Sequence, residues 1–133
     1  MAIEALVKYS HDDVFEVEAL DSRVKLYIDK LAENHSPQGP GPLEMFLSAL
    51  GGCVGVYAKR YLSRHEIPFK KLNIQVKAEL SQDPPMRLSK IQVQVETDAK
   101  LPADNKSVFE KFIRNCPVHN TLLHTKEVTI QVG

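Results

Sequence analysis

The chain has 133 residues, of which 43% are hydrophobic and 26% are charged, values typical of a soluble globular protein. Seventeen basic and seventeen acidic side chains balance, and no basic stripe is interleaved with aromatics, which excludes nucleic acid as an expected partner. The N-terminus lacks the pattern of a signal peptide, and the longest apolar run, near residues 45–58, is too short to span a bilayer. We therefore expect a single cytoplasmic domain over residues 1–133 with no membrane partner.

The first thirty residues show a period of two, which is typical of strands with one apolar face. The segments SHDD and LDSR interrupt this alternation as turns, so the pattern predicts three antiparallel strands in a meander. Residues 32–42, AENHSPQGPGP, are rich in proline and glycine and predict a loop. The alternating apolar residues are Ile3, Ala5, Val7, Tyr9, Val14, Val17, Ala19, Val24, Leu26 and Ile28.

One long helix is predicted over residues 42–65. Pro42 suits the first helical turn, where its missing N–H is not needed, and Pro68 disfavours continuation. Residues 45–58 are apolar on nearly every side, which predicts a central helix surrounded by other elements.

The second half of the chain predicts a strand pair, two further helices and a last strand. The strands cover residues 69–81 and 87–98, the amphipathic helix lies within 101–115, the short helix within 116–124, and the last strand within 127–133. The element order βββ–α–ββ–α–α–β belongs to the α+β class.

Three glycines surround Cys53 inside the long predicted helix, namely Gly51, Gly52 and Gly55. Each costs about 1 kcal/mol relative to alanine in a helix interior, so this stretch needs a compensating reason. The small residues leave the backbone almost bare around the thiol. Very close packing of another helix and admission of a substrate to the sulfur are both compatible with this pattern.

The second cysteine, Cys116, precedes Pro117, a favoured residue of a first helical turn. Cys116 is therefore expected at the cap of the short helix, where free N–H groups stabilise a thiolate and lower its pKa. A cysteine that only caps the turn is the simpler alternative. No close pair of metal-ligand cysteines is present, so no metal site is expected.

The stretch GPLEMFLSALGGC, residues 41–53, followed 63 positions later by CPVHNTL, resembles the OsmC/Ohr family of osmotically inducible and organic hydroperoxide resistance proteins. The resemblance covers nearly the whole chain and implies an intertwined homodimer with two sites at the subunit interface. It also implies that the central helices pack closely beside the thiols, which would explain the glycines.

The activity implied by the resemblance is reduction of organic hydroperoxides in oxidative stress defence. Cys53 is similar in position to the peroxidatic cysteine of the family and Cys116 to the resolving one, with an external dithiol as reductant and no cofactor. The thiolate of Cys53 would become a sulfenic acid that condenses with Cys116 to a disulfide.

Two positions depart from the family pattern of an arginine and a glutamate beside the thiolate. The glutamate position falls on Leu43, and the neighbouring Glu44 points about 180° away from Cys53 on a regular helix. Arg23, within the predicted strand DSRVKLYID, is the best positional match for the arginine, and Arg60 lies two turns after Cys53. The motif ALGGC with a displaced glutamate is similar to a less characterised branch of the family.

Apolar residues of the long helix are expected to form a substrate wall that favours an organic tail over hydrogen peroxide. The alternative function is a redox-sensing or small-ligand-binding module on the same fold without fast peroxide turnover. The predicted wall residues are Phe46, Leu50, Val56 and Tyr57.

Overall fold

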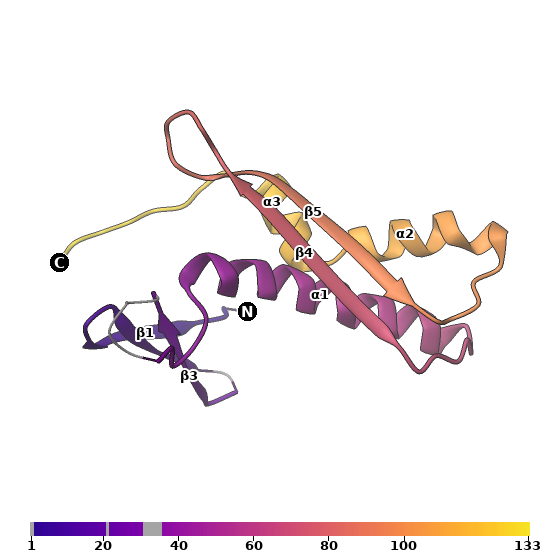
Figure 1. Cartoon of the computed structure of the whole chain (residues 1–133), viewed down its shortest axis with the longest axis horizontal. Helices are drawn as coiled ribbons and strands as arrows, with labels where there is room; N and C mark the ends of the chain where they lie inside the picture. The colour runs from indigo at the N-terminus through magenta and orange to yellow at the C-terminus, as the bar shows by residue number, and fades with distance from the viewer. Residues whose placement is uncertain (1, 21, 31–35) are drawn as a thin grey trace. The chain divides into compact units, whose positions relative to one another are not determined.

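The computed structural model describes residues 2–20, 22–30 and 36–133, and the chain forms two compact units, residues 1–46 and 47–133 (Figure 1). The elements confirm the α+β class predicted from the sequence. None of the helices in the described part of the chain is long and apolar enough to cross a membrane.

The first unit contains a three-stranded antiparallel meander, as predicted. Its strands are β1 (Ala5–His11), β2 (Val14–Ala19) and β3 (Val24–Asp29), in the order β1-β2-β3. The turn before β3 includes Arg23 in the left-handed conformation, with φ of 59°. Arg23 therefore lies in a turn and not in the strand where the sequence pattern places it. The predicted turn LDSR and the loop 32–42 lie partly outside the described residues.

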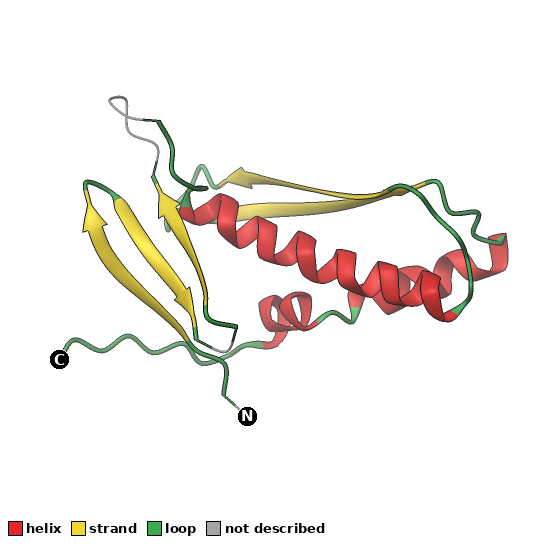
Figure 2. Ribbon diagram, turned by 90° about the horizontal axis from the view of Figure 1, so that it is seen from below, coloured by secondary structure: helices red, strands yellow, loops and turns green. Residues whose placement is uncertain are grey.

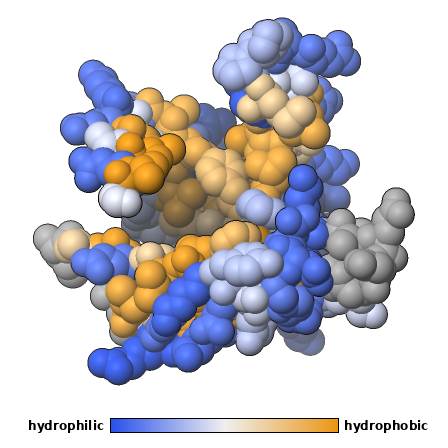
Figure 3. Space-filling view, turned by 90° about the vertical axis from the view of Figure 1, so that its left-hand side faces the viewer, coloured by the Kyte–Doolittle hydropathy of each residue, from blue (hydrophilic) through white to orange (hydrophobic). Residues whose placement is uncertain are grey.

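The strand register gives this sheet one wholly apolar face. Directly paired residues of antiparallel strands share a face, and here Val7, Val17 and Leu26 form one row across the sheet. Tyr9 and Phe15 form an edge-to-face pair with ring centroids 5.5 Å apart. The face is open in part, since Val7 is 52% and Tyr9 is 65% exposed. Apolar side chains, orange, also reach the surface in the space-filling view (Figure 3).

The segment before the long helix is fixed by backbone contacts at the end of β3. Asp29 is buried, its Oδ2 accepts the backbone N–H of Gln38 at 2.9 Å, and its own N–H donates to the carbonyl of Pro40 at 3.0 Å. A Cβ on Gly39 would overlap the carbonyl oxygen of Tyr27, so only glycine fits there. The chain thus passes tightly over β3 as it enters the helix.

The long helix α1 spans Pro42–Arg64, close to its predicted bounds. It ends in a Schellman motif, because Ile67 N–H donates to the carbonyl of Leu62 at 2.9 Å and Glu66 N–H to that of Ser63 at 3.2 Å. Glu66 takes the left-handed conformation that this motif requires, with φ of 53°. Backbone geometry therefore ends the helix before Pro68 is reached.

The second unit places an antiparallel hairpin, β4 (Leu72–Leu80) and β5 (Leu88–Thr97), along α1 (Figure 2). The face that packs toward α1 is apolar and the opposite face is polar, which is the alternation expected of a sheet with one covered face. The outward polar residues are Asn73, Gln75, Lys77, Glu79, Lys90, Gln92, Gln94 and Glu96.

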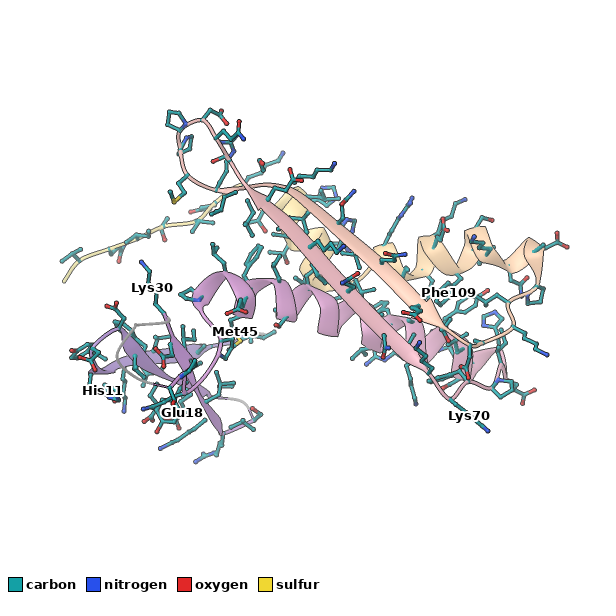
Figure 4. All side chains as sticks on the ribbon, in the orientation of Figure 1. His11, Glu18, Lys30, Met45, Lys70 and Phe109 are labelled. Atoms are coloured by element: carbon teal, nitrogen blue, oxygen red, sulfur yellow. The ribbon has the colours of Figure 1, made fainter. Side chains whose placement is uncertain are left out.

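A 3₁₀ turn (Ala103–Asn105) leads into α2 (Lys106–Arg114), which is followed by α3 (Pro117–His124). Phe109 of α2, labelled in Figure 4, packs with Tyr61 of α1 at a centroid distance of 5.1 Å. Together with Ala58 and Leu62 these rings form a buried cluster that closes the far end of α1.

The predicted last strand over residues 127–133 is not formed in the single chain. The segment pairs with no strand among the described residues, and its alternating residues Val128, Ile130 and Val132 are 82%, 91% and 98% exposed. A strand needs the edge of a neighbouring strand for its backbone hydrogen bonds, and the alternation in the sequence does not identify that neighbour.

Candidate thiol site

The structure brings the two cysteines together within the second unit. Cys116 is fully buried in a cluster with Leu50 and Val54, and Cys53 and Tyr57 pack against this cluster. The two thiols are free, and Cys53 is close enough to Cys116 to influence its pKa. Two sulfurs that are distant along the chain therefore share one apolar environment, in which Cys53 is half-buried.

Cys116 caps α3, as predicted, but the expected effect on its pKa is wrong. Its sulfur accepts the backbone N–H of His119 at 3.4 Å, with Pro117 in the first turn. This contact lowers the pKa of Cys116, but burial raises it more, and the neighbouring Cys53 raises it further. Removal from water penalises the thiolate more than the backbone N–H groups of His119 and Val118 stabilise it. Cys116 therefore keeps its proton at neutral pH.

Hydrogen bonds at the junction of α2 and α3 hold Cys116 in place. The His119 Nδ1–H donates to the carbonyl of Arg114 at 2.6 Å, which fixes this ring nitrogen as the protonated one. The side-chain amide of Asn120 donates to Oδ1 of Asn115 at 3.1 Å. Both bonds span the bend between the two helices, so the cap position of the thiol is rigidly defined.

Two of the three glycines around Cys53 face strand β4 within the chain, and the close approach of two helices in a dimer stays a prediction. A Cβ on Gly51 would lie 3.0 Å from Cγ2 of Val76, and one on Gly55 would lie 3.4 Å from Cγ1 of Ile74. Both positions thus let β4 approach α1 closely. Gly52 has nothing within 4 Å of its added Cβ among the described residues, and this position is exposed.

The predicted wall residues divide into two groups. Leu50 and Tyr57 lie with the thiols in the apolar cluster. Val56 is 49% exposed and lies on the outer side of α1, away from that cluster. Phe46 is the last residue of the first unit and is 40% exposed.

The charged candidates have their own local partners. Glu44 Oε1 accepts the N–H of Gly41 at 3.1 Å, which caps the start of α1. The guanidinium of Arg60 lies 5.5 Å from the centroid of the Tyr57 ring. Arg23 belongs to the first unit. A role of Glu44 or Arg23 beside the Cys53 sulfur stays a prediction.

The packing of Arg64, Phe112 and Tyr57 was not predicted from the sequence. The guanidinium of Arg64 lies 5.7 Å from the centroid of Phe112, and Phe112 lies 5.5 Å from Tyr57. Arg60 and Arg64 are four residues apart on one helix, a spacing that could have shown that they share a face, but the aromatic partner on α2 is set by tertiary packing.

The sequence model of the OsmC-like protein family matches residues 33–132. The chain belongs to this family. No curated protein matches its sequence. Among solved structures, the OsmC-like protein of Mycoplasma pneumoniae is similar, with a TM-score of 0.79, 22% identity, and 94% of this chain and 89% of that chain covered.

Two further structures of the same fold are named for hydroperoxide resistance. The organic hydroperoxide resistance protein OsmC of Legionella pneumophila has a TM-score of 0.62 and 15% identity, with 92% of this chain and 89% of that chain covered. The organic hydroperoxide resistance protein OhrB of Bacillus subtilis has a TM-score of 0.57 and 15% identity, with 94% and 93% covered. At these identities the likeness shows the fold alone.

Proposed function

We propose that this OsmC-like protein is a thiol peroxidase that reduces organic hydroperoxides in oxidative stress defence. The observation that carries the proposal is that Cys53 packs against the apolar cluster that contains Cys116. The names of the Legionella and Bacillus proteins, which share the fold, support it.

Cys53 is the sulfur that meets the peroxide, because it is half-buried whereas Cys116 is fully buried and keeps its proton. The Cys53 thiolate attacks the distal peroxide oxygen, so that an S–O bond forms while the O–O bond breaks. The alkoxide leaves with the electron pair and takes a proton to become the alcohol. The sulfur is oxidised to a sulfenic acid and the peroxide is reduced.

Cys116 then resolves the sulfenic acid. Its sulfur bonds to the Cys53 sulfur, and the sulfenic hydroxyl leaves with the Cys116 proton as water. The two cysteines belong to one apolar cluster, which supports direct reaction between their sulfurs. An external dithiol returns both cysteines to thiols by exchange and is itself oxidised to a disulfide. The cycle uses no cofactor.

The working form in this proposal is a homodimer in which Arg23 or Glu44 contributes to the thiolate environment. The partly open apolar face that includes Val7 and Tyr9 supports a covering partner, as does the unpaired, alternating segment 127–133. Contiguous exposed apolar surface of this kind is typical of interaction sites.

The apolar surroundings of the thiols favour an organic substrate. Leu50 and Tyr57 would contact the tail of a bound hydroperoxide, and hydrogen peroxide has no tail to bury. We expect cumene hydroperoxide to be turned over faster than hydrogen peroxide at equal concentration, as measured by peroxide consumption. Equal rates would contradict an apolar substrate site.

The cysteine assignment is tested with two matched variants. Cys53→Ser is expected to abolish consumption of cumene hydroperoxide in the presence of a dithiol. Cys116→Ser is expected to retain the first oxidation, detected by mass spectrometry as a trapped sulfenic acid on Cys53, and to form no intramolecular disulfide. Unchanged peroxide consumption by Cys53→Ser would refute the enzyme proposal. Oxidation of Cys53 in the wild type without turnover would favour the redox-sensing module.

A further inference from the structure

His119 joins the end of α2 to the thiol of Cys116. Its backbone N–H donates to the Cys116 sulfur at 3.4 Å, and its ring Nδ1–H donates to the carbonyl of Arg114 at 2.6 Å. Arg114 is the last residue of α2, and His119 lies in the first turn of α3. Because one residue makes both contacts, the anchor of its ring on α2 restricts the direction of the N–H that faces the sulfur.

Two helix caps meet in His119. It is the third residue of α3, a position whose N–H an N-cap side chain commonly accepts, and here that side chain is the Cys116 thiol. The ring also binds a carbonyl in the last turn of α2, a group that has no partner inside its own helix. Each cap by itself stabilises a helix end. Their meeting at one residue links the sulfur to the junction of the two helices.

The resolving step requires negative charge to develop on a sulfur that burial keeps neutral. Cys116 is fully buried, and burial raises its pKa, whereas the N–H groups of His119 and Val118 lower it. Donors that are fixed in advance where charge develops stabilise a transition state without having to rearrange. The N–H of His119 is such a donor, and its contact with the sulfur strengthens as the thiol loses its proton.

We propose that His119 is a positioning residue for the resolving cysteine: its ring, held by Arg114, aims its backbone N–H at the Cys116 sulfur and thereby speeds the attack on the sulfenic acid of Cys53. In this step the S–S bond forms, the S–H and S–O bonds break, and the proton leaves with the hydroxyl as water. The Cys116 sulfur is oxidised and the sulfenic sulfur is reduced. The role in this reaction rests on the proposed thiol peroxidase, but the effect of the N–H on the thiol does not.

Three variants isolate the contact of the ring with α2. His119→Ala removes the hydrogen bond to Arg114 but keeps the backbone N–H. His119→Asn keeps a side-chain N–H donor close to the position of Nδ1. Thr121→Val is the matched control, because it removes the hydrogen bond from the Thr121 hydroxyl to the carbonyl of Pro117, 2.7 Å long and within the same helix, and leaves the junction unchanged.

The junction of α2 and α3 keeps a second hydrogen bond when His119 is replaced. The side-chain amide of Asn120 donates to Oδ1 of Asn115 at 3.1 Å. We therefore expect His119→Ala to fold, which circular dichroism checks. His119→Leu, which fills the same space without a donor, replaces His119→Ala in each measurement if the alanine variant does not fold.

The effect of the N–H on the thiol is measured first, without peroxide. In a Cys53→Ser background, the Cys116 thiolate is followed by its ultraviolet absorbance against pH, and the same protein with Cys116→Ala serves as the blank. His119→Ala is expected to raise the pKa of Cys116, so that the ratio of thiolate to thiol at a given pH falls about tenfold, the factor that one hydrogen bond to a charged group contributes.

The other two variants separate positioning from a general loosening of α3. His119→Asn is expected to restore most of the thiolate ratio, and Thr121→Val to leave it unchanged. An unchanged ratio in folded His119→Ala would overturn the positioning role. No restoration by His119→Asn, or an equal fall in Thr121→Val, would also overturn it.

Rapid-mixing kinetics separate this inference from the proposed function. With cumene hydroperoxide and Cys53 present, His119→Ala is expected to slow disulfide formation about tenfold at neutral pH, while the first oxidation of Cys53 keeps its rate. Disulfide formation at the wild-type rate in His119→Ala would overturn the positioning role and leave the peroxidase standing. The expected titrations in a protein whose Cys53 is not oxidised by peroxide would support the positioned N–H and refute the peroxidase.

Discussion

The β1–β3 sheet and the β4–β5 hairpin have the same alternation of apolar and polar residues but differ in how their apolar faces are covered. In the hairpin, Ile74 and Val76 lie against the glycines of α1. In the first sheet, Val7 and Tyr9 are 52% and 65% exposed. The comparison teaches that a period of two predicts a face that needs covering but not the element that covers it.

The largest expected effect lies in the covered unit. Leu62 of α1 is fully buried in the cluster that includes Phe109 of α2, so Leu62→Ala is expected to lower the free energy of unfolding by about 3 kcal/mol through a cavity. The contrasting variant is Leu26→Ala on the first sheet, where the side chain is 36% exposed and the cost in an isolated chain should be well below that of Leu62→Ala. Urea denaturation at several protein concentrations measures both.

The dependence of the Leu26→Ala cost on protein concentration shows whether the apolar face of the first sheet is covered. A cost of Leu26→Ala that grows with protein concentration indicates that a second copy covers Leu26. Equal costs of the two substitutions at every concentration would contradict the contrast between the two regions.

The second effect is on assembly. Val7→Asp places a charge in the row with Val17 and Leu26, so a dimer that covers this face should be lost, with the dissociation constant raised at least about tenfold. The matched control is Lys8→Asp, one residue along β1 and thus on the polar face. Analytical ultracentrifugation measures both variants. An assembly that tolerates Val7→Asp but not Lys8→Asp would contradict the proposal that the apolar face is the interface, and would place the interface on the polar face.

Much of the fold is predictable from the sequence because local signals and tertiary packing agree. Proline at the start of α1 places its N-terminus, and the alternation in β4 and β5 marks a strand pair with one covered face. The segment 127–133 has an equally clear alternation but forms no strand, because a strand depends on a partner edge that sequence pattern cannot identify.

The candidate site is predictable only in part. The resemblance singles out Cys53 and Cys116, and the structure places both in one apolar cluster. The raised pKa of Cys116 was not foreseen, because capping is visible in the motif CPVHN whereas burial depends on residues of α1 and the hairpin. The contact of Arg64 with Phe112 could not be predicted from the sequence for the same reason, since Phe112 belongs to another helix.

A smaller effect, of about 1 kcal/mol, is expected for alanine substitutions at Gly51 and Gly52, which should change the free energy of unfolding in opposite directions. Gly51→Ala is expected to destabilise the protein, because its Cβ would press on Cγ2 of Val76 at 3.0 Å and the gain in helix propensity does not offset this strain. Gly52→Ala adds a methyl group into open space and is expected to stabilise an isolated chain by about 1 kcal/mol. Thermal or urea denaturation at low protein concentration measures both.

The effect of Gly52→Ala on stability at high protein concentration tests whether this side of α1 is covered by a second copy. If a second copy packs closely on this side of α1, the same substitution should weaken the assembly. Stabilisation that is independent of concentration would show that Gly52 faces solvent in every form of the protein.

The smallest expected effect is the pH dependence that buried Cys116 gives to the covered unit. Burial raises the pKa of Cys116 above its ordinary value of 9.0, so the folded state holds the thiol proton more tightly than the unfolded state does. The resulting stability is fully present below about pH 9 and is lost as the pH rises through the folded-state pKa.

Cys53→Ser is the suitable background, because Cys116 is then the only thiol that titrates, and Cys53→Ser with Cys116→Ala is the reference. We expect the difference in free energy of unfolding between the two proteins to shrink from pH 7.5 to pH 10, as measured by urea denaturation. A difference that stays constant or grows over this range would mean that Cys116 ionises at least as easily in the folded chain as in the unfolded one, and its cap contact with His119 would then balance or outweigh its burial.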